Sequence, residues 1–266
     1  MLDSTFKSTQ SVQGGRSHKP QNTPTLNSSE LLAFKAPVRG KRVMLEKLVP
    51  EHAEYLHTIY QNDAFWASYR LNENRSRNVE EIKQRLLEES RYSPAQMRKC
   101  EWVVFRLQNG DKTPIGLAGL LDLVDSQKRA EFLIGIVNTE NRLHGIGLEA
   151  TLCVFDFAFN IQRLNKLVSL IYSNNESAQA NTIALGFSKE GELRKHFRNS
   201  STGEYSNIIQ NGLLLDEFRR SVRLSSLSQR LLGRDVTLAP VLGDAVASTM
   251  PEESQFELHA KFEIRY

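Results

Sequence analysis

The chain contains few cysteines and no long apolar segment, and each absence narrows what it can do. Only two cysteines, Cys100 and Cys153, occur among its 266 residues, too few for a disulfide framework or a cysteine-rich metal site. No stretch approaches the roughly 20 apolar residues that a membrane-spanning helix needs, and the N-terminus lacks the apolar core of a signal peptide. We therefore expect a cytoplasmic chain with no metal and no membrane partner, in which Cys153 is a buried small hydrophobe.

The charge is nearly balanced, with 34 basic and 31 acidic residues and a net charge of +3. Nucleic-acid-binding proteins normally have a strongly basic surface, so we expect no nucleic-acid partner. Internal repeats are absent, and the hydrophobic fraction of 40% is enough to build a core. The length suits one domain with extensions or two small domains.

Composition separates a polar N-terminal segment from the rest of the chain. More than half of residues 1–37 are Ser, Thr, Gln, Asn, Gly or Pro, which leaves little apolar surface to offset the entropy lost on ordering. We expect this segment to be a disordered tail, residues 38–217 to form the main domain, and residues 218–266 to form a C-terminal extension.

The end of the chain should contain a helix, a linker and a final strand. The helix is expected over residues 216–232 and should end at Gly233. After a linker over residues 234–255, apolar residues fall at every second position over residues 256–266, a pattern typical of a strand with one apolar face. Such a strand must cover a sheet edge or face, in this subunit or in a second copy, so it predicts a homodimer as one outcome.

The main domain alternates strand and helix patterns. Strands are expected over residues 42–48, 102–107, 114–124, 128–137, 166–172, 187–197 and 205–215, and helices over residues 50–60, 79–92, 148–159 and 176–185. Asn109 and Gly110 form a hairpin-turn signal, and residues 62–78 are expected to form a loop. The predicted class is α+β, a mixed sheet of about seven strands flanked by about four helices. The strand over 166–172 should lie parallel to the strand over 128–137, because a helix connects them.

A glycine-containing stretch, Arg142-Leu-His-Gly145-Ile-Gly147, lies where a strand passes into a helix. The first N–H groups of a helix have no intrahelical partner and carry partial positive charge, and glycine lets a phosphate approach them closely. Arg142 adds a positive charge beside them. The stretch therefore predicts a pyrophosphate site, although glycines at such a junction also serve turns and caps.

This element order, with Arg142-x-x-Gly145-x-Gly147 at the fourth strand–helix junction, resembles the GCN5-related N-acetyltransferase (GNAT) superfamily. A second match is Asn175 followed by Leu185-Gly186-Phe187, which is similar to the family's Asn-x-x-Ala/Ser…Leu-Gly-Phe segment. A third is Gly203-x-Tyr205-x-Asn207, where many relatives have aspartate at the last position. The resemblance covers residues 40–217, in a branch that includes ribosomal-protein N-terminal, spermidine and nucleotide-amino-sugar acetyltransferases.

The resemblance implies acetyl-CoA as the acetyl donor and a primary amine as the acceptor, on a protein N-terminus, a polyamine or an amino sugar. Arg142 and the backbone N–H groups around the glycines would hold the donor's pyrophosphate, at His144, Gly145, Ile146 and Gly147. The pantetheine arm would pair with the strand backbone at Ile134, Ile136 and Val137. Asn175 would hydrogen-bond the pantetheine or the donor amide.

Acetyl transfer to an amine needs a base for the amine proton, donors for the oxyanion and a proton donor for the departing thiolate. Glu131 is the candidate base, with an ion pair to Lys128 or Arg129 as its structural alternative. Many relatives have a tyrosine seven residues after the motif asparagine, and Thr182 occupies that position here. Its hydroxyl can donate a hydrogen bond but is a weak acid, and Thr182 can equally be a packing residue.

Three further features leave alternatives open. The missing tyrosine, the tail and the final strand are also compatible with a CoA-binding or assembly module of low catalytic activity. Trp66 and Tyr69 can flank the acceptor or close the core over the first two helices. The arginines between residues 219 and 234 can be a solvated helix face or a docking surface for an acidic partner.

Overall fold

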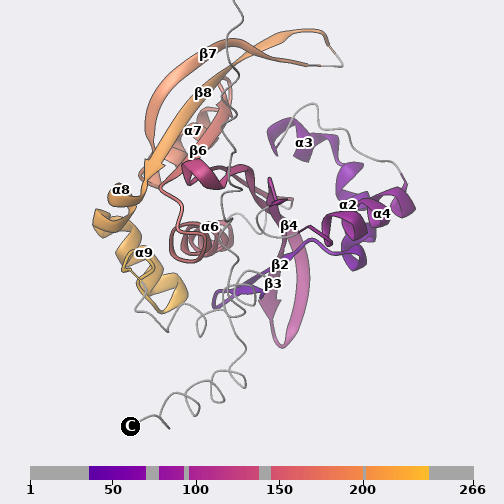
Figure 1. Cartoon of the computed structure of the whole chain (residues 1–266), viewed down its shortest axis with the longest axis horizontal. Coiled ribbons are helices and arrows are strands. Elements are labelled where there is room, and N and C mark those ends of the chain that lie inside the picture. The colour runs from indigo at the N-terminus through magenta and orange to yellow at the C-terminus, as the bar shows by residue number, and fades with distance from the viewer. Residues whose placement is uncertain (1–35, 70–77, 93–95, 138–144, 200–201, 240–266) are drawn as a thin grey trace, which may run out of the picture.

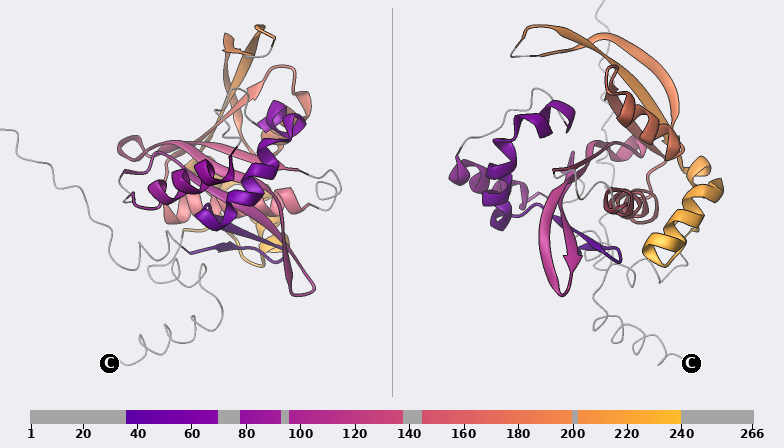
Figure 2. Two further views of the ribbon diagram at one scale, coloured as in Figure 1. Left: turned by 90° about the vertical axis from the view of Figure 1, so that its right-hand side faces the viewer. Right: turned by 180° about the vertical axis from the view of Figure 1, so that it is seen from behind.

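The computed structural model describes residues 36–69, 78–92, 96–137, 145–199 and 202–239, and these form one mixed sheet with helices on both faces (Figures 1 and 2). The sheet has eight strands in the order β1-β2-β3-β4-β5-β6-β8-β7. Their bounds are β1 Val38–Arg39, β2 Val43–Lys47, β3 Cys100–Gln108, β4 Asp111–Val124, β5 Arg129–Ile136, β6 Lys166–Tyr172, β7 Ser188–Arg198 and β8 Tyr205–Leu214. The predicted α+β class and mixed sheet are confirmed, with the two-residue strand β1 added at one edge.

Two features that define the topology agree with the prediction, namely the β3–β4 hairpin and the parallel pairing of β5 with β6. Asn109 and Gly110 both have positive φ, 55° and 86°, and turn β3 into β4 as an Asn-Gly hairpin requires. The pair β5–β6 is parallel, while every other neighbouring pair in the sheet is antiparallel. Strand β8 lies between β6 and β7, so the last hairpin joins the sheet through its second strand.

The helical elements lie on opposite faces of the sheet, as the two opposed views show (Figures 1 and 2). Their bounds are η1 Pro50–His52, α2 Ala53–Tyr60, α3 Asp63–Tyr69, α4 Val79–Glu89, η3 Asp125–Gln127, α6 Ile146–Asp156, the π-helical turn η4 Phe157–Ile161, α7 Glu176–Ala184, α8 Leu215–Arg220 and α9 Val222–Leu232. Helices α2, α3 and α4 cover one face around their own apolar cluster. Helices α6, α8 and α9 share the larger core on the other face.

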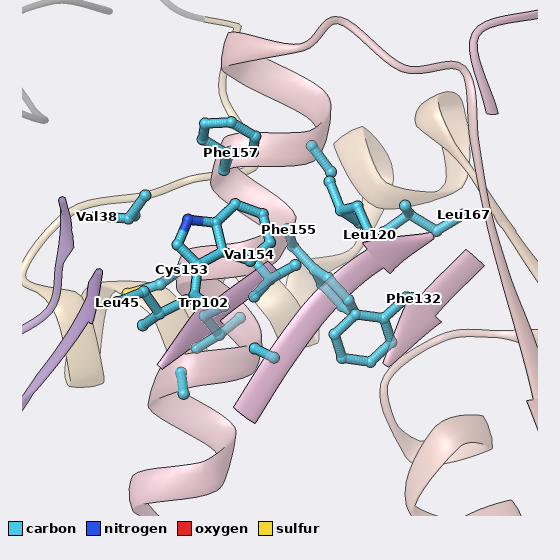
Figure 3. Close-up of a cluster of buried hydrophobic side chains, with 14 of the residues drawn as sticks. Val38, Leu45, Trp102, Leu120, Phe132, Cys153, Val154, Phe155, Phe157 and Leu167 are labelled. Carbon is cyan, nitrogen blue, oxygen red and sulfur yellow. The ribbon is translucent and has the colours of Figure 1, made fainter. Parts of the chain in front are cut away.

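Helix α6 is the centre of the larger core, and its burial explains its apolar sequence. Cys153, Val154 and Phe155 are all fully buried there (Figure 3). Trp102 of β3 meets Phe157 edge to face, with ring centroids 5.0 Å apart. A helix that is apolar on every side must be enclosed by other elements, and this one lies between the sheet and α9. The predicted role of Cys153 as a buried small residue is confirmed.

Residues 63–69, expected to be part of a loop, instead form helix α3. Asn62 begins it, with its side-chain oxygen accepting a hydrogen bond from the Phe65 N–H at 3.0 Å. Phe65, Trp66 and Tyr69 are buried against one another, and the Trp66 ring N–H donates to the Ile59 carbonyl at 2.9 Å. Aromatic residues have modest helix propensity, so tertiary burial stabilises this helix. Trp66 closes the core over α2, which was one of the two alternatives. Tyr69 belongs to the same core but also lines a cleft.

The prediction of a single helix over residues 216–232 is also wrong, because Ser221 divides this segment into α8 and α9. Ser221 has an extended ψ of 98°, and its hydroxyl oxygen accepts a hydrogen bond from the Leu224 N–H at 3.2 Å. A serine in that conformation is a good N-cap. The break changes the direction of the chain, while Gly233, with φ 79°, ends α9 as predicted.

Several predictions fall on residues that the structure leaves undescribed. Most of the expected tail and the whole strand expected over residues 256–266 lie outside the described residues, so both stay predictions. Among the described residues, no helix is long and apolar enough to cross a membrane.

Candidate active site

The main cleft opens where strands β5 and β6 diverge. They pair at only three positions, Arg129 with Lys166, Ala130 with Leu167 and Glu131 with Val168. Beyond Glu131 the two strands separate, and a cleft of about 750 Å³ lies between them. Residues of α6, α7 and α9 line it, and so do Phe65 and Tyr69 of α3. Because these helices belong to opposite faces, the cleft connects the two sides of the sheet.

Strand β5 directs part of its backbone into this cleft. The Val137 N–H donates to the Ile115 carbonyl of the β4 side at 2.8 Å, and backbone groups alternate in direction along a strand. The N–H and C=O groups of Ile134 and Ile136 therefore point toward the edge of β5 that no longer pairs with β6. Both residues line the cleft, whereas Val137 packs on the opposite face against α3 and its neighbours.

The glycine stretch lies at the start of α6, as its sequence predicts. Gly145 is the N-cap in the left-handed conformation, with φ 71°, and both Gly145 and Gly147 line the cleft. Ile146 points its side chain into the core. The first N–H groups of a helix are available to an anion, so this end of the cleft suits a phosphate. Arg142 and His144 lie outside the described residues, and their roles stay predictions.

A buried carboxylate connects this helix start to the edge of the sheet. Glu149 of α6 is fully buried and accepts hydrogen bonds from the Arg42 backbone N–H at 2.6 Å and from the Arg42 Nε at 3.0 Å. The Arg42 Nη2 lies 3.8 Å from where a Cβ on Gly145 would be. Arg42 thus brings a guanidinium that is already paired with Glu149 close to the predicted phosphate site, a position that its place in a strand pattern did not suggest.

Helix α7 forms the other wall of the cleft. Asn175 is its N-cap, and its side-chain oxygen accepts a hydrogen bond from the Ala178 N–H at 3.1 Å, which leaves the side-chain NH₂ to face a ligand. Asn175 and Thr182 both line the cleft, two turns apart on the same helix. The structure therefore brings these two predicted residues to the same surface as Gly145, Gly147 and Ile134.

Aromatic side chains line the cleft on the opposite side of the sheet. Phe65 and Tyr69 stack with ring centroids 5.0 Å apart, and they approach β5 so closely that a Cβ on Gly135 would lie 2.6 Å from the Phe65 ring. Tyr172 of β6 also lines the cleft and meets Phe197 edge to face at 5.6 Å. This side is therefore an apolar, aromatic entrance.

Glu131, the predicted base, lies at the fork between β5 and β6. It is partly buried and occupies the last position where the two strands pair. Alternation along β5 places its side chain on the same face as Leu133 and Gly135, which line the aromatic side of the cleft. Glu131 itself is not among the lining residues, so it would reach a ligand through water.

Comparison with known proteins identifies the family of this arrangement. A model of the acetyltransferase (GNAT) domain matches residues 42–188, more than half of the chain. The chain belongs to the GNAT acetyltransferase family. The resemblance that the two motifs predicted is thereby confirmed, and the chain is an acyltransferase that uses acetyl-CoA as its donor substrate.

Several named proteins are similar to this GNAT enzyme. It is 24% identical over 169 residues to YoaA of Bacillus subtilis, an uncharacterized N-acetyltransferase, covering 63% of this chain and 91% of that protein. It is 34% identical over 102 residues to the spermidine N(1)-acetyltransferase of Escherichia coli, covering 38% of this chain and 52% of that enzyme. Among solved structures, a spermidine N-acetyltransferase from Vibrio cholerae, in complex with CoA and spermine, superimposes with a TM-score of 0.57 at 22% identity over 66% of this chain and 97% of that one.

The GNAT enzyme has no reactive thiol in this cleft. Both cysteines are buried in the larger core. Burial raises the pKa of the Cys100 thiol to about 11 and raises the pKa of the Cys153 thiol as well. A thiol must ionise to act as a nucleophile, so transfer through a cysteine thioester has no candidate residue here. No cluster of metal-ligating side chains occurs in the described part of the chain.

Proposed function

We propose that this enzyme transfers the acetyl group of acetyl-CoA to a primary amine that enters from the aromatic side of the cleft. The observation that carries the proposal is the cleft between β5 and β6, which connects the helix start at Gly145 on one face with Phe65 and Tyr69 on the other. A donor bound along α6 and α7 would present its thioester at the fork, and the amine would meet it from the opposite face.

The side chains at the fork suit the steps of the reaction. The amine nitrogen forms a bond to the thioester carbonyl carbon, the carbon–sulfur bond breaks, and the amine proton leaves through Glu131 or a water that Glu131 orders. Backbone N–H groups of Ile134 and Ile136 would stabilise the oxyanion. The Thr182 hydroxyl would donate a hydrogen bond to the departing thiolate, which takes its proton from solvent. Asn175 would hold the pantetheine amide.

The donor site can be tested with a variant that introduces two carboxylates and with a matched control. We expect calorimetry to show acetyl-CoA binding to the unmodified protein and a loss of at least about a hundredfold in the Arg142→Glu, Gly145→Glu variant, because two carboxylates would repel the pyrophosphate. Gly110→Glu is the control, since Gly110 also has a positive φ but lies in the β3–β4 turn with nothing within 4 Å of an added Cβ. Absence of binding by the unmodified protein would refute the proposal.

The acceptor can be identified by thiol release across a panel of amines. Spermidine and spermine come first, because two relatives are named for spermidine acetylation, followed by peptide N-termini and amino sugars. Asn207, where many GNAT relatives have aspartate, is not among the residues that line the cleft. It accepts a hydrogen bond from the Lys195 N–H at 2.8 Å and donates one to Glu192. Asn207 therefore stabilises the β7–β8 hairpin, and its side chain does not indicate the charge of the acceptor.

A homodimer through residues 256–266 and a cytoplasmic location are further parts of this proposal. We expect the mass in solution to fall from dimer to monomer when the chain is cut after residue 239. That cut point retains Val236 and Thr237, which are buried, and the Val236 carbonyl, which accepts a hydrogen bond from Asn160 at 2.9 Å. An unchanged oligomeric state in light scattering would exclude this role of the final strand.

A further inference from the structure

Helix α9, which lies outside the matched family domain, places a stripe of three side chains along the donor side of the cleft. Arg223, Leu227 and Arg230 are four and three residues apart, so they share one face of the helix, and all three line the cleft. Leu227 packs against the larger core, while both arginines are exposed. The stripe is therefore an anchored apolar contact with a positive charge on each side.

Among the arginines of the extension that the structure describes, these two lack a hydrogen-bond or ion-pair partner for their guanidinium groups, whereas the others have one. Arg219 donates to the carbonyl oxygens of Thr237 and Leu238 at 3.0 and 2.9 Å, Arg220 pairs with Asp216 at 2.6 Å, and Arg234 pairs with Asp156 at 2.8 Å. Within the described ranges, neither Arg223 nor Arg230 has a carboxylate or carbonyl partner for its guanidinium. Lys41 adds a further positive charge here, because its Nζ donates to the Arg230 carbonyl at 3.1 Å.

We propose that Arg223 and Arg230 bind the 3′-phosphate of CoA and make this enzyme selective for it over 3′-dephospho-CoA. The proposal rests on the proposed function. CoA carries two anionic groups, a pyrophosphate and a ribose 3′-phosphate at the end remote from the thioester. The start of α6 is suited to the first. In both opposed views, α6 lies between α3 and α9 (Figures 1 and 2). Helix α9 is therefore on the side away from the aromatic entrance, where the second phosphate would lie.

The chemistry of the guanidinium group fits this assignment. A phosphate monoester offers three oxygens, and each arginine can donate two parallel hydrogen bonds to it. The two arginines lie about two turns apart on one helix, so the entropy lost on binding is mainly that of their own side chains. The C-terminal extension would then be part of the donor site.

The test compares CoA with 3′-dephospho-CoA by calorimetry on the full chain. We expect the unmodified protein to bind CoA at least roughly tenfold more tightly. The Arg223→Gln, Arg230→Gln variant should lose that preference, with its affinity for dephospho-CoA unchanged within about twofold. Lysine at both positions should restore part of the preference, because the charges return without the fork geometry. The control is Arg220→Gln, whose side chain lies on α8 and outside the cleft lining.

The outcomes separate this inference from the proposed function. If neither nucleotide binds to the unmodified protein, the donor site itself is wrong. Equal affinity of the unmodified protein for both nucleotides would overturn the α9 inference and leave the donor site standing. Equal weakening of both nucleotides in a glutamine variant that melts normally would also overturn it, because the arginines would then serve the pyrophosphate. If the glutamine variant binds both nucleotides as tightly as the unmodified protein does, the inference is overturned as well, because the two arginines would then serve some other partner.

Discussion

Replacing Gly116 with alanine is expected to destabilise the protein by about 3 kcal/mol and to lower its melting temperature by roughly 6–12 °C. Gly116 of β4 lies opposite Ile136 of β5, and an added Cβ would be only 2.1 Å from the Gly135 carbonyl oxygen. The obstructing atom belongs to the backbone, so no side chain can rotate away. The two strands must separate at a position where β5 lines the cleft. Thermal melting followed by circular dichroism measures the effect.

Gly191→Ala is the matched control, because it makes the same chemical change in a strand of the same sheet. An added Cβ at Gly191 of β7 meets no atom within 4 Å, and we expect its melting temperature to stay within about 2 °C of the unmodified protein. Gly116→Ala should also weaken acetyl-CoA binding at temperatures where it is folded, since Ile136 would move. Equal melting temperatures for the two variants would show that β4 and β5 do not approach each other as closely as described.

The elements that the sequence predicted well are those whose patterns are local. The strand expected over 166–172 has the bounds of β6, and Asn109-Gly110 forms the expected turn. Helix α3 was missed because its stability comes from contacts of Phe65, Trp66 and Tyr69 with α2 and β5, which no short window of sequence contains. The break at Ser221 was missed for a different reason, since apolar spacing alone cannot distinguish one helix from two in succession.

The same distinction holds for the site. The sequence could place Gly145, Gly147 and Asn175 at one cleft because motif spacing fixes them relative to one strand–helix junction. Arg42 was missed because 107 residues separate it from Glu149, the side chain that positions it. Arg223 and Arg230 were interpreted as part of a solvated face or of a docking surface for an acidic partner, because their pattern does not show that α9 packs beside α6. Charges that different parts of the chain bring to one ligand become visible only when the fold is known.

Glu131→Gln is expected to lower kcat for the amine acceptor by about a hundredfold or more at neutral pH, with little change in the KM for acetyl-CoA. An alkyl primary amine has a pKa near 10.4 in water and a peptide N-terminus has a pKa of about 8, so at neutral pH most of either amine is protonated and something must take that proton. Glu131 lies at the fork where the donor thioester is expected, on the face from which we propose that the amine enters. Glutamine keeps the size of the side chain but cannot accept the proton. Steady-state thiol release measures both constants.

The pH dependence distinguishes a base from a structural residue. As pH rises toward 10, a growing fraction of the acceptor arrives already neutral, so the ratio of unmodified to Glu131→Gln rates should shrink with pH. A residue that only positions β5 would give a ratio independent of pH, because the same distortion would act on neutral and protonated amine alike. Glu88→Gln is the control, since Glu88 lies exposed on α4, and its ratio should stay near one throughout. A constant deficit for Glu131→Gln would therefore remove Glu131 from the chemistry and leave proton removal to water in the cleft.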